Sequence, residues 1–493
     1  MHYFRVHPDY WEDRMQKIRA LGLNVLQTYV PWNWHETTEG KYALLLKKFV
    51  AVVQISDSSS SIKCIHLPGT VSTIDFGVSE NIDIYNSFHE QDLYSGGAPH
   101  VCSEYWVIWY TRWGDTHDHS WASIKGGINK FKSNLEFMYY NLSASWNIYM
   151  IHGGTSFGFW NGADDPPVIT TSSDWTAAIS EEGDITDTYL AIRDFILNIS
   201  EWEQQPLDVP KNNSKANYGQ VKMTCIGTNL VSTLTRIQET CVSSTDPLSF
   251  EQINYGYGYV LYTTTLTSNG TTLATPNIRD YGYVYLNNVY QGVLLRENLT
   301  SLHLYVNQGD VLRILVENRG RNKNYQVVYD SKGLNVNGTG LNSSARVTLD
   351  GTPLQNWVQC GVNLTKEAID SLSTNFFEKS KNSSPKSGKR NKNQSPKAKA
   401  ASLPGVYVGK FIANEIQDTF FDSTGWGKGQ LFINGYNLGH YWPLAGPQMT
   451  LYVPKPFLQQ KNTVILIELV GGQQTIANFI DHKIWLYPKQ ATI

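Results

Sequence analysis

The pattern of apolar residues near the start of the chain predicts a helix followed by a buried strand. Residues 8–21, PDYWEDRMQKIRAL, have helical spacing, and the predicted apolar face holds Trp11, Met15, Ile18 and Leu21. Pro8 suits the first turn, and Gly22 suits the position after the last. The next run, LNVLQTYV, is rich in β-branched and aromatic residues and ends at PWNWHE. A helix packed on a buried strand that opens into a loop at its carboxyl end is typical of a βα-barrel.

Three later segments repeat the strand pattern. They are TVSTIDFG at 70–77, APHVCSEYW at 98–106, and SWNIYMIHGGTSFGFWNG at 145–162, which runs into a Gly-rich aromatic loop. Asp75 lies at the carboxyl end of the first run, and Glu104 is the carboxylate of the second. Catalytic side chains of βα-barrels are found at such strand ends, so both positions are candidates for chemistry.

From about residue 205 the pattern changes to short alternating runs separated by Gly, Asn and Asp, such as GYGYVLYTTTLTSNGTT and DYGYVYLNNVYQGVLL. These runs predict antiparallel strands of β-sandwiches. Residues 379–399 carry eight Lys/Arg and no acid, which favours a solvated linker over a nucleic-acid or anionic-surface contact. We expect a barrel-type domain at 1–204, a connecting segment and first sandwich at 205–365, a basic linker at 366–403 and a second sandwich at 404–493.

The composition narrows the class of protein. A chain of 493 residues favours two to four domains. Its 15 Trp and 29 Tyr suit both β-sheet cores and surfaces that stack on sugars. The net charge of −3 gives no support to nucleic acid as a partner, and no apolar run is long enough to predict a membrane span.

Sequons and cysteines bear on the cellular compartment. Ten N-x-[ST] sequons favour a lysosomal or secreted protein, at Asn141, Asn198, Asn212, Asn269, Asn298, Asn337, Asn342, Asn363, Asn382 and Asn393. The sequence as given begins without the apolar segment of a signal peptide. Among five cysteines, Cys225 and Cys241 are close enough to close a loop by a disulfide, with free buried thiols an equal alternative. No Cys/His spacing indicates a structural zinc.

Several long motifs together resemble one enzyme family. HYFRVHPDYWEDRM, LGLNVLQTYVPWNWHE, SEYW at 103–106, GGTSFGFWNGA at 153–163, ISEEGDIT at 179–186 and GWGKGQLFINGYNLGHYWP occur in this order. The chain is thereby identified as similar to the β-galactosidases of glycoside hydrolase family 35, of the acid or lysosomal type. That resemblance implies a (β/α)8 barrel followed by galactose-binding-like β-sandwiches. It also implies retaining hydrolysis of terminal β-galactosyl residues by two carboxyl groups, without a cofactor.

The resemblance assigns candidate roles to five residues. Glu104 matches the family's nucleophile. Tyr29 and Tyr149 match tyrosines that line the galactose pocket, and Trp106 and Trp175 stand where sugar-contacting tyrosines are usual. The alternative for the four aromatic residues is plain packing of the barrel rim. His35 and His152 are expected to be structural, since the family chemistry does not use them.

The family's general acid has no counterpart in this sequence. It sits in an Asn-Glu-Tyr-Gly-like motif after the fourth barrel strand, and no such tetrapeptide occurs here. Only 27 residues separate Tyr42 from Thr70, where three βα units of about 25 to 30 residues each are expected. Strands one, two, six, seven and eight of the family barrel can be traced, so the barrel is expected to be incomplete. Among the carboxylates up to Glu104, Asp75 is the best placed replacement acid, although the resemblance matches it to a family position outside the catalytic pair.

Three interpretations follow from the missing segment. The chain is a β-galactosidase impaired as written, a non-catalytic galactoside-binding pseudoenzyme, or an unstable product. The expected partners are β-galactoside glycans, with a homo-oligomer as a further possibility, and no metal or cofactor is expected.

Overall fold

The computed structural model describes residues 1–36, 40–41, 54–57, 71–95, 97–163, 168–321, 331–334, 346–382 and 402–487. The chain falls into two units. The first comprises Met1–Thr111, His117–Thr155 and Ser172–Ser214, and the second comprises Arg112–Thr116, Ser156–Thr171 and Lys215–Ile493.

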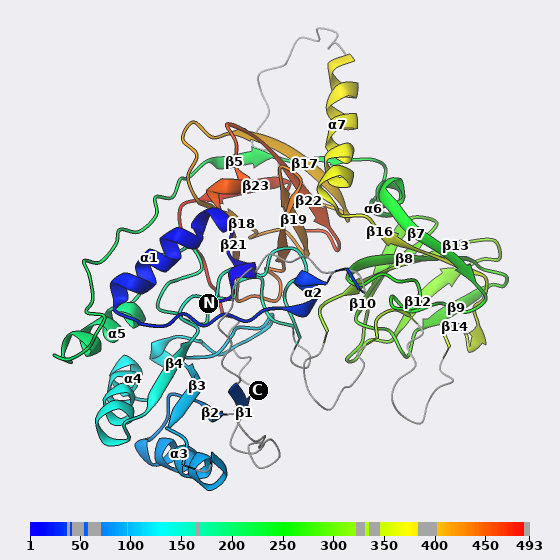
Figure 1. Ribbon diagram of the computed structural model, residues 1–493. Helices are drawn as coiled ribbons and strands as arrows, with labels where there is room; N and C mark the ends of the chain where they lie inside the picture. The colour runs from blue at the N-terminus through cyan, green and yellow to red at the C-terminus, as the bar shows by residue number, and fades with distance from the viewer. Residues whose placement is uncertain are drawn as a thin grey trace. The chain divides into compact units, whose positions relative to one another are not determined.

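The first unit is built on a parallel sheet of four strands in sequence order (Figure 1). The strands are β1 Gln54–Asp57, β2 Val71–Gly77, β3 Val101–Trp106 and β4 Ser145–Tyr149. The helices of this unit are α1 Trp11–Leu21, α2 Trp32–His35, α3 Asn81–Ser95, α4 Gly127–Glu136 and α5 Asp187–Leu197. Helices α3 and α4 follow β2 and β3 and bury apolar side chains with them, because parallel neighbours need such crossovers.

Three of the five predicted barrel strands form: β2, β3 and β4 coincide with the runs at 70–77, 98–106 and 145–162. Their core residues include Ile74, Phe76, Cys102 and Tyr105. The four strands of the described sheet are half of the eight that close a TIM-type barrel. Within the described residues, the sheet is thus an incomplete barrel, as expected.

The predicted strands before residue 31 are wrong. Tyr3–Arg5 is a short 3-10 helix, and residues 25–31 have no regular structure, with Val25 75% and Val30 49% exposed. The segment is held by side chains instead, since Asn147 Nδ2 donates to Gln27 Oε1 at 2.5 Å. A strand needs a ladder partner, and the described residues provide none for this apolar run.

Helix α1 forms as predicted, but its buried face differs. Gly22 ends the helix in the left-handed region at φ 98°, as expected of a residue after the last turn. Met15 is 47% exposed, whereas Arg14 and Lys17 are buried. Both cations reach the carboxylate of Asp13, which neutralises charge that could not otherwise be buried.

The second unit contains two antiparallel β-sandwiches, as the alternating runs predict (Figure 1). The first pairs a six-stranded sheet, β11-β10-β13-β8-β16-β7, with a four-stranded sheet, β12-β9-β14-β15. Its strands are β7 Gln238–Ser244, β8 Gly258–Thr265, β9 Gly270–Ala274, β10 Tyr281–Leu286, β11 Val289–Leu295, β12 Ser301–Val306, β13 Val311–Asn318, β14 Thr348–Leu349, β15 Thr352–Pro353 and β16 Trp357–Val362.

The second sandwich pairs a five-stranded sheet, β20-β19-β22-β17-β6, with a four-stranded sheet, β21-β18-β23-β5. Its strands are β5 Gly219–Lys222, β6 Thr224–Ile226, β17 Gly405–Ile412, β18 Thr419–Asp422, β19 Gly429–Ile433, β20 Tyr436–Tyr441, β21 Thr450–Val453, β22 Lys461–Glu468 and β23 Ile476–Ile480. Helices α6 Leu230–Leu234 and α7 Lys366–Asn382 complete the unit. Residues 383–401, and with them most of the basic tract, lie outside the described part of the chain.

Local turn chemistry fixes the hairpins of the sandwiches. Asn287 and Asn288 join β10 to β11 at φ 49° and 69°, and Asn434 and Gly435 join β19 to β20 at φ 51° and 82°. Positive φ at both central residues gives the type of turn whose twist matches the strands, and Asn and Gly tolerate it best.

The cysteine pairing differs from the proposed Cys225–Cys241 loop. Cys241 on β7 is bonded to Cys360 on the neighbouring strand β16, 119 residues away. Cys225 and Cys102 are free. The two halves of the disulfide are brought together by strand pairing, which the spacing of cysteines along the chain does not reveal.

Candidate functional site

Glu104 lies near the carboxyl end of β3, with both carboxylate oxygens engaged by hydrogen-bond donors. The Tyr29 hydroxyl donates to Oε1, and the Trp106 indole N–H donates to Oε2 at 3.1 Å. Ser103 and Tyr105 on either side are buried, whereas Glu104 and Trp106 are partly exposed. Two donors fix the orientation of the carboxylate.

Aromatic rings continue outwards from Glu104. The Tyr149 ring at the end of β4 lies 6.1 Å from the Tyr29 ring and 5.1 Å, edge to face, from the Trp175 ring. All four aromatic residues that the sequence predicted are thus gathered around Glu104: Tyr29, Trp106, Tyr149 and Trp175. Tyr29 is 38% exposed, and the other three are partly buried. Each ring therefore both packs against neighbours and reaches solvent.

Electrostatics keep the phenols of this cluster protonated. Burial, followed by the Glu104 carboxylate, raises the pKa of Tyr29 and of Tyr149 well above the ordinary value. His2 packs against both rings, at 5.3 Å from Tyr29 and 5.9 Å from Tyr149. Burial and the neighbouring Arg5 lower the pKa of His2 to about 2, so this ring is neutral. The tyrosines can therefore act as donors and not as bases.

Trp175 occupies a backbone conformation that a bulky residue rarely adopts. Its φ is 61°, and that of Thr176 is 54°. Such a conformation costs on the order of 1–3 kcal/mol and persists only where the surroundings hold it. Here the Trp175 indole N–H donates to Ser173 Oγ at 3.1 Å, and the Thr176 hydroxyl donates to the His119 carbonyl at 2.5 Å.

Sequence reasoning missed two aromatic members of the cluster. Trp109 lies 5.1 Å from Trp106 and 5.6 Å from Trp175, and the Tyr110 ring lies 4.9 Å from Trp175. The run YWVIWY at 105–110 is the signal that could have revealed them, because it places aromatic residues at and just beyond the strand end.

The two histidines set aside as structural have protein partners. His152 is fully buried, receives a hydrogen bond from Arg14 Nε at 3.3 Å, and contacts the Ile179 carbonyl through Nδ1 at 3.1 Å. Burial and Arg14 lower its pKa to about 3. His35 Nε2 lies 2.5 Å from the Tyr3 hydroxyl.

The Gly-rich loop after β4 ties the start of the chain to the Trp175 segment. The Thr155 amide donates to the Arg5 carbonyl at 2.9 Å, and the Ser173 amide donates to the Gly154 carbonyl at 2.9 Å. A Cβ on Gly153 would lie 1.5 Å from the Ser173 carbonyl oxygen. The glycine is therefore required for the approach that holds the Trp175 turn against β4.

A buried carboxyl group next to this loop gives the first unit a pH-dependent stability. Glu181 is 5% exposed, and the Thr155 hydroxyl donates to its Oε1 at 2.6 Å. Burial, which outweighs the Thr155 and Ser172 hydrogen bonds, raises the pKa of Glu181 to about 8. The ordinary pKa of a glutamate is 4.5. Between this pH and about pH 8, the folded state thus binds up to one more proton than the unfolded chain.

Glu181→Gln should therefore flatten the dependence of stability on pH. The contribution of Glu181 is fully present below its unfolded pKa and is lost as the pH rises through its folded pKa, so the wild-type midpoint of thermal unfolding should fall between pH 5 and pH 8. Glutamine mimics the protonated acid and should remove this part of the fall. Thermal scans of wild type, Glu181→Gln and the exposed control Glu136→Gln at several pH values check this. Parallel curves for the wild type and Glu181→Gln would contradict it.

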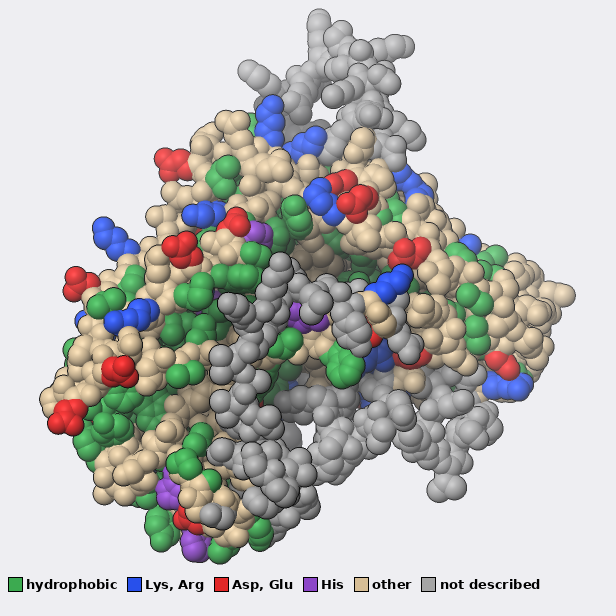
Figure 2. Space-filling view, in the orientation of Figure 1, with side chains coloured by type: hydrophobic (Ala, Val, Ile, Leu, Met, Phe, Trp, Pro, Cys, Tyr) green, Lys and Arg blue, Asp and Glu red, His purple; other side chains and the backbone are tan. Residues whose placement is uncertain are grey.

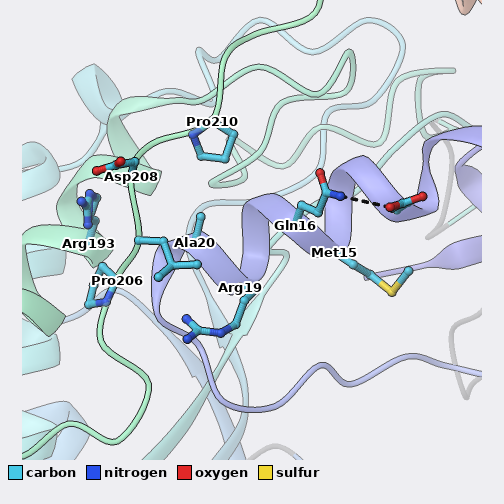
Figure 3. A pocket seen from close by; sticks show the side chains of 10 residues that line it. Met15, Gln16, Arg19, Ala20, Arg193, Pro206, Asp208 and Pro210 are labelled. Atoms are coloured by element: carbon cyan, nitrogen blue, oxygen red, sulfur yellow. Dashed lines mark hydrogen bonds between the residues drawn. The ribbon is translucent and has the colours of Figure 1, made fainter.

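A groove of about 850 Å³ in the first unit lies away from this cluster (Figure 3). Met15, Gln16, Arg19 and Ala20 of α1 line one side, and Arg193 of α5 and the segment 206–210 line the rest. None of the predicted site residues contributes to it. The groove is half apolar and its charges are of both signs, so it adds no chemistry to the Glu104 cluster.

The described residues contain no group of three or more His, Cys, Asp or Glu side chains arranged to hold a metal ion. No helix among them is both long and apolar enough to cross a membrane.

Comparison with known proteins bears on the whole chain. The family model of the glycosyl hydrolases family 35 matches residues 1–59 and 45–199. The model of the β-galactosidase first all-beta domain matches residues 247–363, and that of the β-galactosidase galactose-binding domain matches residues 404–463.

Similar relatives cover nearly all of the chain. A beta-galactosidase of Felis catus is 30% identical over 600 aligned residues, which cover 95% of this chain and 85% of the relative. A beta-galactosidase-1-like protein of Mus musculus is 30% identical and covers 95% and 86%. The beta-galactosidase of Homo sapiens is 29% identical and covers 95% and 84%. Each alignment is longer than the 493 residues of this chain, so the relatives contain positions that it lacks.

Proposed function

The chain belongs to the glycosyl hydrolases family 35, and from this we propose that it acts on terminal β-galactosyl residues of glycans through Glu104 as the attacking carboxylate, with turnover impaired as written. The observation that carries the proposal is the position of Glu104 near the carboxyl end of β3, with Tyr29 and Trp106 donating to its two oxygens. A carboxylate held in one orientation is suited to attack an anomeric carbon.

The impairment follows from the absent Asn-Glu-Tyr-Gly segment. Retaining hydrolysis needs a second carboxyl group to protonate the leaving oxygen. The family model matches this chain in two stretches, 1–59 and 45–199, which overlap at residues 45–59. The relatives also contain aligned positions that the chain lacks. Both facts support an internal deletion in the region where the acid is expected. A substrate whose leaving group needs no proton should be affected least.

Trp106 and Trp175 favour a second candidate function, a galactoside-binding protein without catalysis. Both rings are partly exposed beside Glu104, and aromatic faces stack on sugars. Trp106 also donates to the carboxylate through its indole nitrogen. Binding and covalent chemistry can therefore be separated experimentally.

Covalent trapping tests the proposal without requiring the general acid. A 2-deoxy-2-fluoro-β-galactosyl fluoride has a good leaving group, so we expect Glu104 to form a glycosyl ester that mass spectrometry locates on the peptide containing residue 104. Glu104→Gln should take up no label, and the exposed-site variant Glu136→Gln should be labelled like the wild type. Galactose binding without label would favour the pseudoenzyme, and neither binding nor label would reject both functions.

The compartment and partners belong to the same proposal. Passage through the secretory route to lysosome or exterior is supported by the Cys241–Cys360 disulfide, since such bonds persist in oxidising compartments. Five sequon asparagines are exposed, as glycosylation requires: Asn141, Asn198, Asn212, Asn269 and Asn298. On the face drawn in Figure 2, cationic and anionic side chains are interspersed, which does not favour a nucleic-acid partner. Assembly into a homo-oligomer remains part of the proposal.

A further inference from the structure

We propose that Asp75 is the second carboxylate of this site and acts as the acid/base partner of Glu104. The inference rests on the proposed function of Glu104 and names the residue that takes the place of the missing family acid, at the impaired turnover proposed above. It is carried by the register of two strands, by the contacts of the Asp75 side chain and by the electrostatic surroundings shared with Glu104.

Strand register places Asp75 directly beside Glu104. Strands β2 and β3 are parallel neighbours in which Ile74 pairs with Cys102 and Asp75 pairs with Glu104. Ser103 lies between these two pairs and has no paired residue on β2, so it is the extra residue of the β3 strand at this irregularity. Asp75 and Glu104 are both partly exposed, whereas Ile74 and Ser103 are buried. Solvent therefore reaches both acidic residues.

The spacing of neighbouring strands suits a retaining pair. Adjacent strands lie about 4.8 Å apart. The two carboxyl groups of a retaining glycosidase lie about 5–5.5 Å apart, whereas those of an inverting enzyme are about 6.5–9.5 Å apart. Paired positions on adjacent strands are thus on the scale of the retaining geometry.

The Asp75 carboxylate is oriented by the extra residue of β3. The Ser103 hydroxyl donates to Asp75 Oδ1 at 2.6 Å, and the Ser103 and Thr73 hydroxyls lie 2.6 Å apart. The Ser103 carbonyl in turn accepts from Asn147 Nδ2 at 2.8 Å. The Ser103 hydroxyl, which also contacts the Thr73 hydroxyl, therefore holds one oxygen of Asp75, as an acid/base group requires.

Both carboxylates raise the pKa of the same two phenols, Tyr29 and Tyr149. After burial and Glu104, the charge of Asp75 further raises the pKa of Tyr29 and of Tyr149. Since Tyr29 donates directly to Glu104, Asp75 acts on the immediate surroundings of the nucleophile.

Three other acids that precede Glu104 in the chain have partners of their own. Glu36 accepts hydrogen bonds from the Trp32 indole and from the Gly40 amide, within its own loop. Glu80 pairs with Lys130, and Asp92 pairs with His100 at 2.9 Å. None of these contacts involves Glu104 or its aromatic neighbours.

The reaction balances with these two groups and water. A Glu104 oxygen attacks the anomeric carbon and forms an ester as the glycosidic C–O bond breaks, while protonated Asp75 transfers its proton to the leaving oxygen. Water then attacks the anomeric carbon, Asp75 takes up a proton from that water, and the bond to Glu104 breaks. The products are the alcohol and galactose with retained configuration, and both carboxyl groups return to their starting states.

Leaving-group dependence and azide rescue test Asp75 on the full chain. With a dinitrophenyl β-galactoside, whose leaving group needs no proton, Asp75→Ala should form the galactosyl-enzyme at a rate within about tenfold of the wild type. With phenyl β-galactoside, its rate should fall by at least about a hundredfold, since acid catalysis contributes typically 10²–10⁴-fold. Azide should accelerate Asp75→Ala and give the β-galactosyl azide. Glu104→Ala with azide should give the α-anomer, because azide then enters from the opposite face. If Asp75 had a purely structural role, its replacement would change neither the ratio of the rates on the two galactosides nor the anomer of the azide product.

Asp83→Asn, an exposed acid on α3, is the matched control and should behave as wild type. Asp75→Asn is the second variant in case Asp75→Ala does not fold, and urea unfolding reports on both. If the wild type releases dinitrophenol only when Glu104 is present, yet both Asp75 variants match Asp83→Asn, the Asp75 proposal is wrong while the proposed function stands. If no release depends on Glu104, the proposed function fails, and the Asp75 proposal fails with it.

Discussion

Lys428→Met should destabilise the sandwich unit by about 3–5 kcal/mol, the cost of leaving one partner of a buried ion pair alone. Lys428 Nζ pairs with Glu317 and lies 2.8 Å from the Tyr283 hydroxyl, and both charged side chains are under 5% exposed. Burial alone would raise the pKa of Glu317, but Lys428 and His440 outweigh it and lower that pKa to about 2. Without Lys428 the buried carboxylate loses the cation that pairs with it and keeps the Tyr283 hydroxyl as a donor. Urea unfolding followed by far-UV circular dichroism measures the loss.

The double variant Lys428→Met/Glu317→Gln separates charge from packing. Glutamine keeps an acceptor for the Tyr283 hydroxyl, which donates to Glu317 Oε2 at 2.6 Å, and carries no charge. We expect most of the lost free energy of unfolding to return, because replacing both members of a buried ion pair is often close to neutral. Equal losses in the single and double variants would mean that packing of the lysine stem, and not the uncompensated charge, sets the cost.

Gly153→Ala should destabilise the first unit by roughly 3 kcal/mol and disturb the Trp175 environment. The new Cβ would lie 1.5 Å from the Ser173 carbonyl oxygen and 2.7 Å from its carbon, and both are backbone atoms. The segment 173–175 must therefore move, although the Ser173 amide is bonded to Gly154. Chemical unfolding and near-UV circular dichroism, which reports on Trp175 and its aromatic neighbours, check both effects.

Gly162→Ala in the same loop is the matched control. No atom of the described residues lies within 4 Å of the position where its Cβ would be, and its φ is not in the left-handed region, so stability should change little. The prediction fails if the two alanine variants unfold at the same denaturant concentration.

The parts of the fold that depend on local pattern could be predicted from the sequence. Strands β2, β3 and β4 and the Asn-rich hairpins each carry their signal within a few residues. The apolar run before residue 31 could not, because a strand exists only where a neighbour offers a ladder. The burial of Arg14 likewise depends on Asp13, on His152 and on the turn at Gly183, which is distant in sequence.

The candidate site likewise has one part that could be predicted from the sequence and one part that could not. The motif around Glu104 and the positions of Tyr29, Tyr149, Trp106 and Trp175 were accessible through family resemblance, and the structure gathers these residues in one cluster. The pairing of Asp75 with Glu104 needed the strand register, which includes an irregularity that no count of residues along the chain anticipates. Their roles in the reaction stay predictions.

Residues Ser156–Thr171 continue the loop of the first unit but pack within the second. Phe157 contacts Phe457 at 5.4 Å, Phe159 contacts His440 at 5.3 Å, and the Thr171 hydroxyl donates to the His440 carbonyl, 269 residues further along the chain. At a synthesis rate of about 5–20 residues per second, the ribosome needs on the order of 10–50 s to supply these partners. During that interval two phenylalanines of the nascent loop are uncovered, so the chain depends on chaperones most strongly before its carboxyl-terminal sandwich has been made.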